Sequence, residues 1–165
     1  MGIEIERKFL LADASWRGQV SRSERLAQGY VNPAQAVRTG EQAVSVRVRI
    51  GNERAWLNLK SREQAGVRQE FEYAIPVVDA EALLALCVGG RIEKRRHHLD
   101  HAGHHWEIDE FLGDNAGLIV AEIELSRPDE SFVHPPWLGR EVTGQARYYN
   151  LSLAEHPYIR WDETT

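Results

Sequence analysis

The chain opens with Ile3-Glu4-Ile5-Glu6-Arg7-Lys8-Phe9-Leu10, in which apolar and charged side chains alternate. This period of two predicts a β-strand. Because successive side chains of a strand point to opposite faces, Glu4, Glu6 and Lys8 share one face. The opposite face carries Ile3, Ile5 and Phe9. Taken alone, the stretch is typical of a sheet with its charges in water and its apolar side on the core.

The same alternation recurs along the chain. Residues 24–32 predict a second strand, closed by Pro33, and six more are expected at 44–50, 55–60, 67–75, 91–100, 104–112 and 118–125. Turns at Gly51-Asn52 and Ala102-Gly103 make hairpins, so the sheet should be mainly antiparallel. Eight such strands can close into a barrel whose interior holds side chains or one small ligand.

Helices are expected to be few. The clearest covers 80–88, with Asp79 as N-cap and Gly89-Gly90 as its stop. A second is expected at about 146–155, and a short helical turn at 15–17. Residues 33–42 and the proline-containing segment up to Gly139 show no period and are expected to be irregular.

Composition indicates one domain spanning residues 1–165. The net charge of −5 argues against a general binder of nucleic acid or anionic membranes. Cys87, the single cysteine, lies among leucines and is expected to be a buried structural thiol in a reducing compartment. No apolar run suits a signal peptide or a membrane span, so a cytoplasmic location is expected.

Applied to every strand, the alternation rule collects many ionisable groups on matched faces. The basic ones are Lys8, Arg47, Arg49, Lys60, Arg68, Lys94 and Arg96, and the acidic ones are Glu4, Glu6, Glu70, Glu72, Glu107, Asp109, Glu122 and Glu124. In an open sheet these faces would be a solvated lattice of weak ion pairs. In a closed barrel they would point inward, with the apolar faces turned out toward the helices. The residues alone leave both architectures open.

The closed barrel would require ligands for its interior charges. Two cations 4 Å apart repel by about 4 kcal/mol at an effective dielectric constant near 20. Clustered arginines and lysines would therefore need a multiply charged anion, and clustered glutamates would need divalent cations. A polyphosphate with Mg²⁺ meets both needs, because the hard metal bridges carboxylate and phosphate oxygens.

The ordered set of motifs resembles one family across the whole chain. Glu4-x-Glu6-x-Lys8 is followed, in family order, by Gln28-Gly29-Tyr30, Arg47-x-Arg49, Leu59-Lys60, Arg68-x-Glu70-x-Glu72, Lys94-x-Arg96, Asp109-Glu110-Phe111, Ala121-Glu122-Ile123-Glu124 and Glu141-Val142-Thr143. This set is similar to that of the CYTH superfamily, the triphosphate tunnel metalloenzymes. The resemblance implies an α+β fold: an eight-stranded, mainly antiparallel closed β-barrel, or tunnel, with flanking helices.

The resemblance also implies roles for individual residues. The expected metal ligands are Glu4, Glu6, Asp109, Glu122 and Glu124, with Mg²⁺ or Mn²⁺ as the metal, in two ions. The expected substrate-binding residues are Lys8, Arg47, Arg49, Lys60, Arg68, Lys94 and Arg96. Lys8, Lys60, Glu4 and Glu6 are the expected catalytic residues, with Lys60 as an alternative proton acceptor. Gln145-Ala146 departs from the acidic residue expected before Arg147-Tyr148.

The implied activity is metal-dependent hydrolysis of a triphosphate, with inorganic tripolyphosphate as the first choice. A thiamine triphosphatase, an adenylyl cyclase of this family and a non-catalytic polyphosphate or nucleotide binder are the alternatives. The expected partner is a small-molecule triphosphate, without nucleic acid or membrane. The oligomeric state is left open, a homodimer included. His97, His98, His101, His104 and His105 crowd one hairpin and are expected to be exposed rather than zinc-binding.

Overall fold

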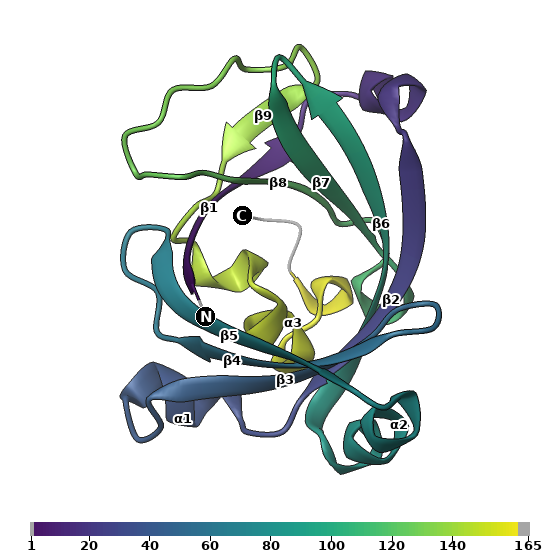
Figure 1. Cartoon of the computed structure of the whole chain (residues 1–165), viewed down its shortest axis with the longest axis vertical. Helices are drawn as coiled ribbons and strands as arrows, with labels where there is room; N and C mark the ends of the chain where they lie inside the picture. The colour runs from purple at the N-terminus through teal and green to yellow at the C-terminus, as the bar shows by residue number, and fades with distance from the viewer. Residues whose placement is uncertain (1, 162–165) are drawn as a thin grey trace.

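The computed structural model describes residues 2–161, which form one nine-stranded sheet and several short helices. All strand pairings are antiparallel, in the order β5-β4-β3-β2-β6-β7-β8-β1-β9. A further pairing of β5 with β1 closes the first eight of these into a ring and leaves β9 outside it (Figure 1). The strands are β1 Gly2–Leu11, β2 Arg22–Tyr30, β3 Val44–Ile50, β4 Ala55–Ser61, β5 Val67–Ile75, β6 Val88–His101, β7 His104–Phe111, β8 Ile119–Glu124 and β9 Leu138–Glu141.

Between residues 2 and 161, three α-helices and four 3₁₀ turns pack around the ring or against one of its ends. The helices are α1 Ala34–Thr39, α2 Val77–Leu86 and α3 Asn150–Glu155, and the turns are η1 Ser15–Gln19, η2 Gly113–Asn115, η3 Ala146–Tyr148 and η4 Tyr158–Arg160. In the part of the chain that the structure describes, none of these helices is both long and apolar enough to cross a membrane.

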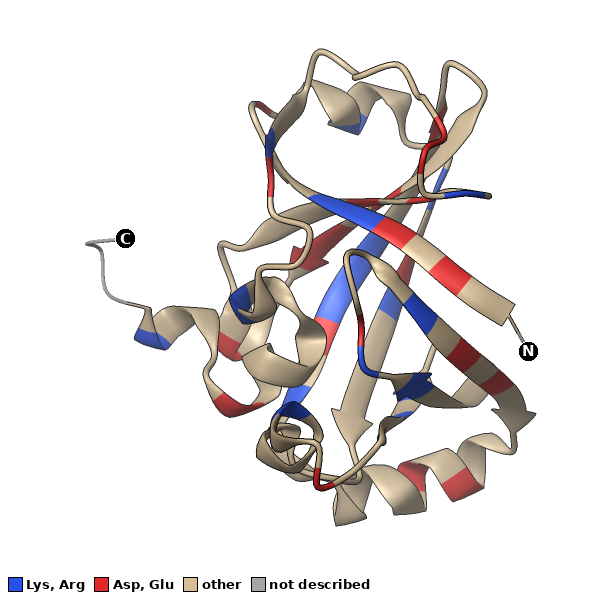
Figure 2. Ribbon diagram, turned by 90° about the vertical axis from the view of Figure 1, so that its left-hand side faces the viewer, with Lys and Arg blue, Asp and Glu red and all other residues tan. Residues whose placement is uncertain are grey.

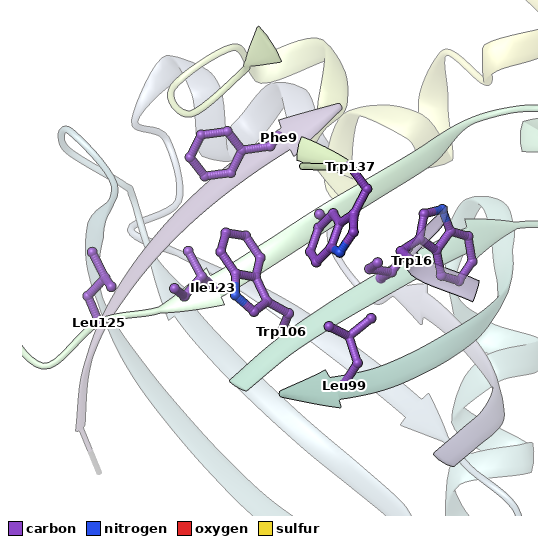
Figure 3. Packing of buried hydrophobic residues seen from close by; sticks show 9 residues of the cluster. Phe9, Trp16, Leu99, Trp106, Ile123, Leu125 and Trp137 are labelled. Atoms are coloured by element: carbon purple, nitrogen blue, oxygen red, sulfur yellow. The ribbon is translucent and has the colours of Figure 1, made fainter. Parts of the chain in front are cut away.

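The largest apolar core lies outside the ring, as the closed architecture requires. It combines outward side chains of β1, β6, β7 and β8 with Trp16 of η1 and Trp137, which precedes β9 (Figure 3). Trp106 and Trp137 meet edge to face with ring centroids 5.4 Å apart. Phe9 belongs to this core while its neighbour Lys8 faces the interior. Burial of these aromatic faces orients the charged faces inward.

Helix α2 covers a second patch of the outer surface. Its Ala80 and Leu84 pack with Val48 and Ala55 of β3 and β4. The helix lies so close to β2 that a Cβ at Gly29 would stand 2.9 Å from the Cys87 sulfur. Glycine is therefore required there by the close approach of the chain.

One end of the ring is filled by apolar side chains. Leu153 and Ala154 of α3 and Tyr148 of η3 join Ile92, Phe111 and Val120, which lie on the inward faces of their strands. Figure 1, which looks into the ring, shows α3 across its opening. We call this cluster, with Tyr30 and Leu118, the plug. On β6, β7 and β8, the side chains that point into the ring are thus apolar at the plug and charged farther from it.

The predicted ring is confirmed, but several predicted boundaries are wrong. Residues 33–42 are not all loop, because α1 begins after Pro33 and ends at Thr39, before Gly40, whose φ is +82°. Proline at a helix start and glycine just past its end are the signals that indicate this helix. The irregular segment before Gly139 gives way to β9, which pairs with β1.

The two expected helices also differ in extent. Helix α2 begins directly after Pro76, so Asp79 lies in its first turn and is not the N-cap. Gly89 and Gly90 belong to β6, which begins earlier than the expected strand 91–100. The helix expected over 146–155 is divided into η3 and α3 at Tyr149, which has an extended backbone.

Candidate functional site

The inward rows line a central cavity of about 1050 Å³. Its ionisable lining comprises Glu4, Glu6, Lys8, Arg38, Arg47, Arg49, Lys60, Arg62, Glu63, Arg68, Glu70, Glu72, Arg96, His105, Glu107, Glu122 and Glu124. Figure 2 shows the acidic and basic positions as bands on neighbouring strands. Most of the predicted site residues are therefore brought together, by the same alternation that predicts the strands.

Two arginines of β3 form the least compensated basic part of the cavity. Arg47 is buried, and its Nε donates to Asn58 Oδ1 at 3.4 Å while Nη2 stands 3.8 Å from Glu70. Arg49 contacts Glu72 at 2.9 Å, but its buried Nε has no hydrogen-bond partner among residues 2–161. Burial, Arg47 and Arg96 lower the pKa of Arg49 to about 10. This surplus of positive charge is suited to an anion.

Lys60 and Arg68 share one carboxylate. Lys60 Nζ donates to Glu4 Oε1 at 2.8 Å, and Arg68 Nε donates to Glu4 Oε2. Burial followed by the charges of Arg47 and Arg68 lowers the pKa of Lys60 from its ordinary value. The two cations hold the pKa of Glu4 well below its usual range despite its burial.

Lys8 has a different environment from Lys60. It is 3% exposed, and its ammonium group donates to Glu122 and lies 3.3 Å from Glu6. Burial works against the charged form, but Glu122 and Glu6 outweigh it and raise the pKa of Lys8. Lys8 therefore stays protonated, whereas Lys60 is closer to losing its proton.

The acids of β1 and β8 are in excess over nearby cations. Burial, Glu122 and Glu4 raise the pKa of Glu6. Burial, Glu4 and Glu70 raise that of Glu124, which forms no ion pair with any side chain in the described range 2–161. Like charges that face one another across neighbouring strands favour a bound divalent cation.

Lys94 and Asp109 lie outside the cavity lining, one step closer to the plug. Both are almost fully buried, and the Lys94 ammonium donates to Asp109. Arg96 Nε and Nη2 each donate to Asp109, one to each oxygen, at 2.7 Å. Burial and Arg96 lower the pKa of Lys94 to about 8, against the pull of Asp109. The pair is thus buried beneath Arg96, away from the ligand space.

Some lining residues could not be found from the strand pattern. Tyr149, Asn150, Leu151 and Ser152 reach the cavity from the start of α3, and Ala146 from η3. Tyr149 donates to Glu63, and Lys8 Nζ lies 5.7 Å from the centre of its ring. No periodicity predicts this contact, because it depends on how the C-terminal segment enters the end of the ring.

The hairpin histidines are less exposed than expected. His97 and His98 are buried, and His98 lies between Glu24 and His105.

Outside the ring, the guanidinium group of Arg7 forms a two-pronged ion pair with Glu141, whose Oε1 also accepts a hydrogen bond from Thr143. Glu141 and Thr143 thus hold the end of β9 and the residues after it against β1.

The structure is therefore a closed antiparallel ring whose interior combines incompletely paired arginines with incompletely paired carboxylates. The CYTH domain family matches residues 2–158 of the sequence. The chain belongs to the CYTH domain family, and the predicted family is confirmed.

The most similar relatives in the comparisons carry one name. The chain is 40% identical over 164 residues to an inorganic triphosphatase of Acetivibrio thermocellus, covering 99% of this chain and 100% of that protein. It is 35% identical over 154 residues to an inorganic triphosphatase of Nitrosomonas europaea, covering 92% and 96%. These relatives are hydrolases that act on triphosphate.

Solved structures give the same fold. The inorganic triphosphatase NE1496 matches with a TM-score of 0.65 and 34% identity, covering 93% of this chain and 95% of that one. A putative adenylyl cyclase from Hippeastrum with a dominant triphosphatase activity matches with a TM-score of 0.57 over 78% of this chain and 81% of that one. At 18% identity, the second match shows the fold alone.

Proposed function

We propose that this protein hydrolyses inorganic tripolyphosphate, bound inside the ring with Mg²⁺ or Mn²⁺. The observation that carries the proposal is the division of the cavity into a basic wall and an acidic wall. Arg47 and Arg49 lack full compensation on one side, and Glu6 and Glu124 lack it on the other. A linear triphosphate with divalent cations satisfies both walls at once.

The acidic wall fits a hard divalent cation because its donors are carboxylate oxygens. We assign Glu4, Glu6, Glu122 and Glu124 as the residues that would hold it. When bound, such a cation withdraws charge from phosphate oxygens and lowers the barrier to attack by water. Asp109 is left out of this set, because it is fully buried next to the plug and does not line the cavity.

The remaining chemistry is assigned to the basic residues. Arg47, Arg49 and Arg68 would bind the phosphate oxygens, with guanidinium groups that can contact two oxygens at a time. Lys8, which stays charged, would neutralise the leaving phosphate. Lys60, whose pKa is lowered, is the better candidate to accept a proton from the attacking water.

The test is phosphate release from tripolyphosphate, thiamine triphosphate and ATP, each with Mg²⁺ and with Mn²⁺, beside an assay for cyclic AMP. We expect the highest kcat/KM for tripolyphosphate and no cyclic AMP. Glu6→Gln should lose activity while it keeps the far-UV circular dichroism spectrum of the fold. Cyclic AMP without phosphate release from tripolyphosphate, a preference for thiamine triphosphate, or binding of all three without turnover would each overturn the proposal.

A further inference from the structure

A group of three metal-ligating side chains lies at the end of the ring opposite the plug. It comprises His98, His105 and Glu107, with one donor atom of each within 4.8 Å of the others. None of the three belongs to the acidic wall described above. The group is formed by β6 and β7, which pair with His98 opposite Glu107 and Asp100 opposite His105.

The same alternation that forms the cavity places these residues. Along β6 the inward row runs from Ile92 in the plug through Lys94 and Arg96 to His98. Glu107 and His105 continue the matching row of β7 toward the same end. The donor type therefore changes along the ring, from carboxylates deep in the cavity to imidazoles at its end.

Each histidine is held by a carboxylate on one ring nitrogen. His98 Nε2 lies 2.9 Å from Glu24 Oε1, and His105 Nδ1 lies 2.8 Å from Asp100 Oδ1. Because an ionised carboxylate only accepts hydrogen bonds, these nitrogens are the donors. A metal binds the neutral form of imidazole, and in that form these hydrogen bonds would leave the lone pair on the other nitrogen of each ring.

The two remaining nitrogens face each other. His98 Nδ1 is 3.1 Å from His105 Nε2, and Glu107 Oε1 is 3.8 Å from His98 Nδ1. Two lone pairs at this distance need a proton or a cation between them. In a tetrahedral zinc site with bonds of about 2.0–2.1 Å, the two nitrogens lie about 3.3–3.4 Å apart, so only a small adjustment is needed.

We propose that His98, His105 and Glu107 form a second metal site, selective for Zn²⁺ or a similar transition metal over Mg²⁺. Imidazole ligands suit zinc, cobalt and nickel, whereas Mg²⁺ prefers oxygen ligands throughout. Glu24 and Asp100 are the outer carboxylates that such histidine ligands usually have. His105 is half exposed, which leaves a path for the metal and a free position for water.

The proposed metal site borders the central cavity and contacts one of its arginines. Glu107 Oε2 accepts a hydrogen bond from Arg96, and His105 and Glu107 both line the central cavity. A cation on Glu107 would weaken its hold on Arg96. Metal binding at this group is independent of the proposed triphosphatase activity and can be measured without substrate.

The experiment loads the chelator-treated protein with Zn²⁺ or Co²⁺ in buffer that contains millimolar Mg²⁺. We expect one Zn²⁺ per chain after gel filtration, and the intense visible absorption of tetrahedral Co²⁺. His105→Ala and Glu107→Gln should weaken Zn²⁺ binding by more than 10-fold. Asp100→Asn, which changes only an outer carboxylate, should weaken it by about 10–100-fold.

The matched control is His156→Ala, which removes an exposed histidine outside the group and should bind Zn²⁺ like the wild type. His98 is not substituted, because it is buried and its loss could disturb the fold. Wild-type Zn²⁺ binding by His105→Ala, displacement of Zn²⁺ by Mg²⁺, or a weak octahedral Co²⁺ spectrum would each overturn the proposal.

Discussion

Replacement of Asp109 by asparagine separates a structural role of this residue from the metal-binding role that the family resemblance implies. Asp109 is fully buried and accepts hydrogen bonds from Lys94 and Arg96 on both oxygens. Asparagine keeps one acceptor but turns an NH₂ group toward a cationic donor. The substitution therefore leaves buried positive charge without its counterion.

The expected cost follows from this geometry. Removal of one partner from a buried ion pair typically destabilises a protein by about 3–5 kcal/mol. For a chain of this size, each kcal/mol lowers Tm by about 2–4 °C, so Asp109→Asn should lower Tm by roughly 6–20 °C. The control is Glu110→Gln, on the outer face of the same strand, where Glu110 contacts Arg17 and His97 and is itself partly exposed. It should cost no more than about 1 kcal/mol.

The assay is urea unfolding followed by tryptophan fluorescence, with and without saturating Mg²⁺. If Asp109 is structural, Mg²⁺ should stabilise Asp109→Asn as much as it stabilises the wild type, because the bound cation raises stability by mass action. A loss of stability below about 1 kcal/mol, together with loss of the Mg²⁺ effect, would refute the structural role. It would return Asp109 to the set of metal ligands.

Two further predictions concern residues of the cavity, and a third concerns the packing of the end of α2 on β2. Because the pKa of Glu6 is raised from 4.5, folding takes up a proton above that pH, so metal-free stability should fall as pH rises. The pKa of Glu124 is raised as well, so Glu6→Gln should reduce this fall in Tm scans without abolishing it, and it should lower kcat by more than about 100-fold. If Lys60 accepts the proton, Lys60→Arg should lower kcat/KM by about 10²–10⁴-fold and remove the acid limb of its pH profile, whereas Lys8→Arg should keep that limb. Gly29→Ala should cost about 1–3 kcal/mol in urea unfolding. Addition of Cys87→Ala, which removes the sulfur but keeps the Cβ, should recover part of the loss, and no recovery would show that the sulfur is not the source of the clash.

The sequence pattern was sufficient to predict which face of each strand is charged. The resemblance to the CYTH superfamily was needed to predict that these faces point into the ring. Strand alternation depends only on local geometry, so it places Glu4, Glu6 and Lys8 correctly on one inward row. The alternation does not predict how deep in the cavity each inward side chain lies. Lys94 and Arg96 look equivalent in the sequence, yet only Arg96 lines the cavity, because the plug of α3 buries the level of Lys94. That packing is long-range and has no periodic signal.

Depth also explains how the ring tolerates so many interior charges. Next to the plug, where water is excluded, Asp109 is fully paired with Lys94 and Arg96, and an unpaired charge there would be costly. Farther along the cavity the pairing is incomplete: within the described chain, the buried Nε of Arg49 has no hydrogen-bond partner, and Glu6 faces like charges. These incompletely paired groups are destabilising in the free protein and are stabilised when a ligand of opposite charge binds. The positions at which the pairing fails therefore mark where the phosphates and cations would bind, more sharply than the charge pattern of the strands alone.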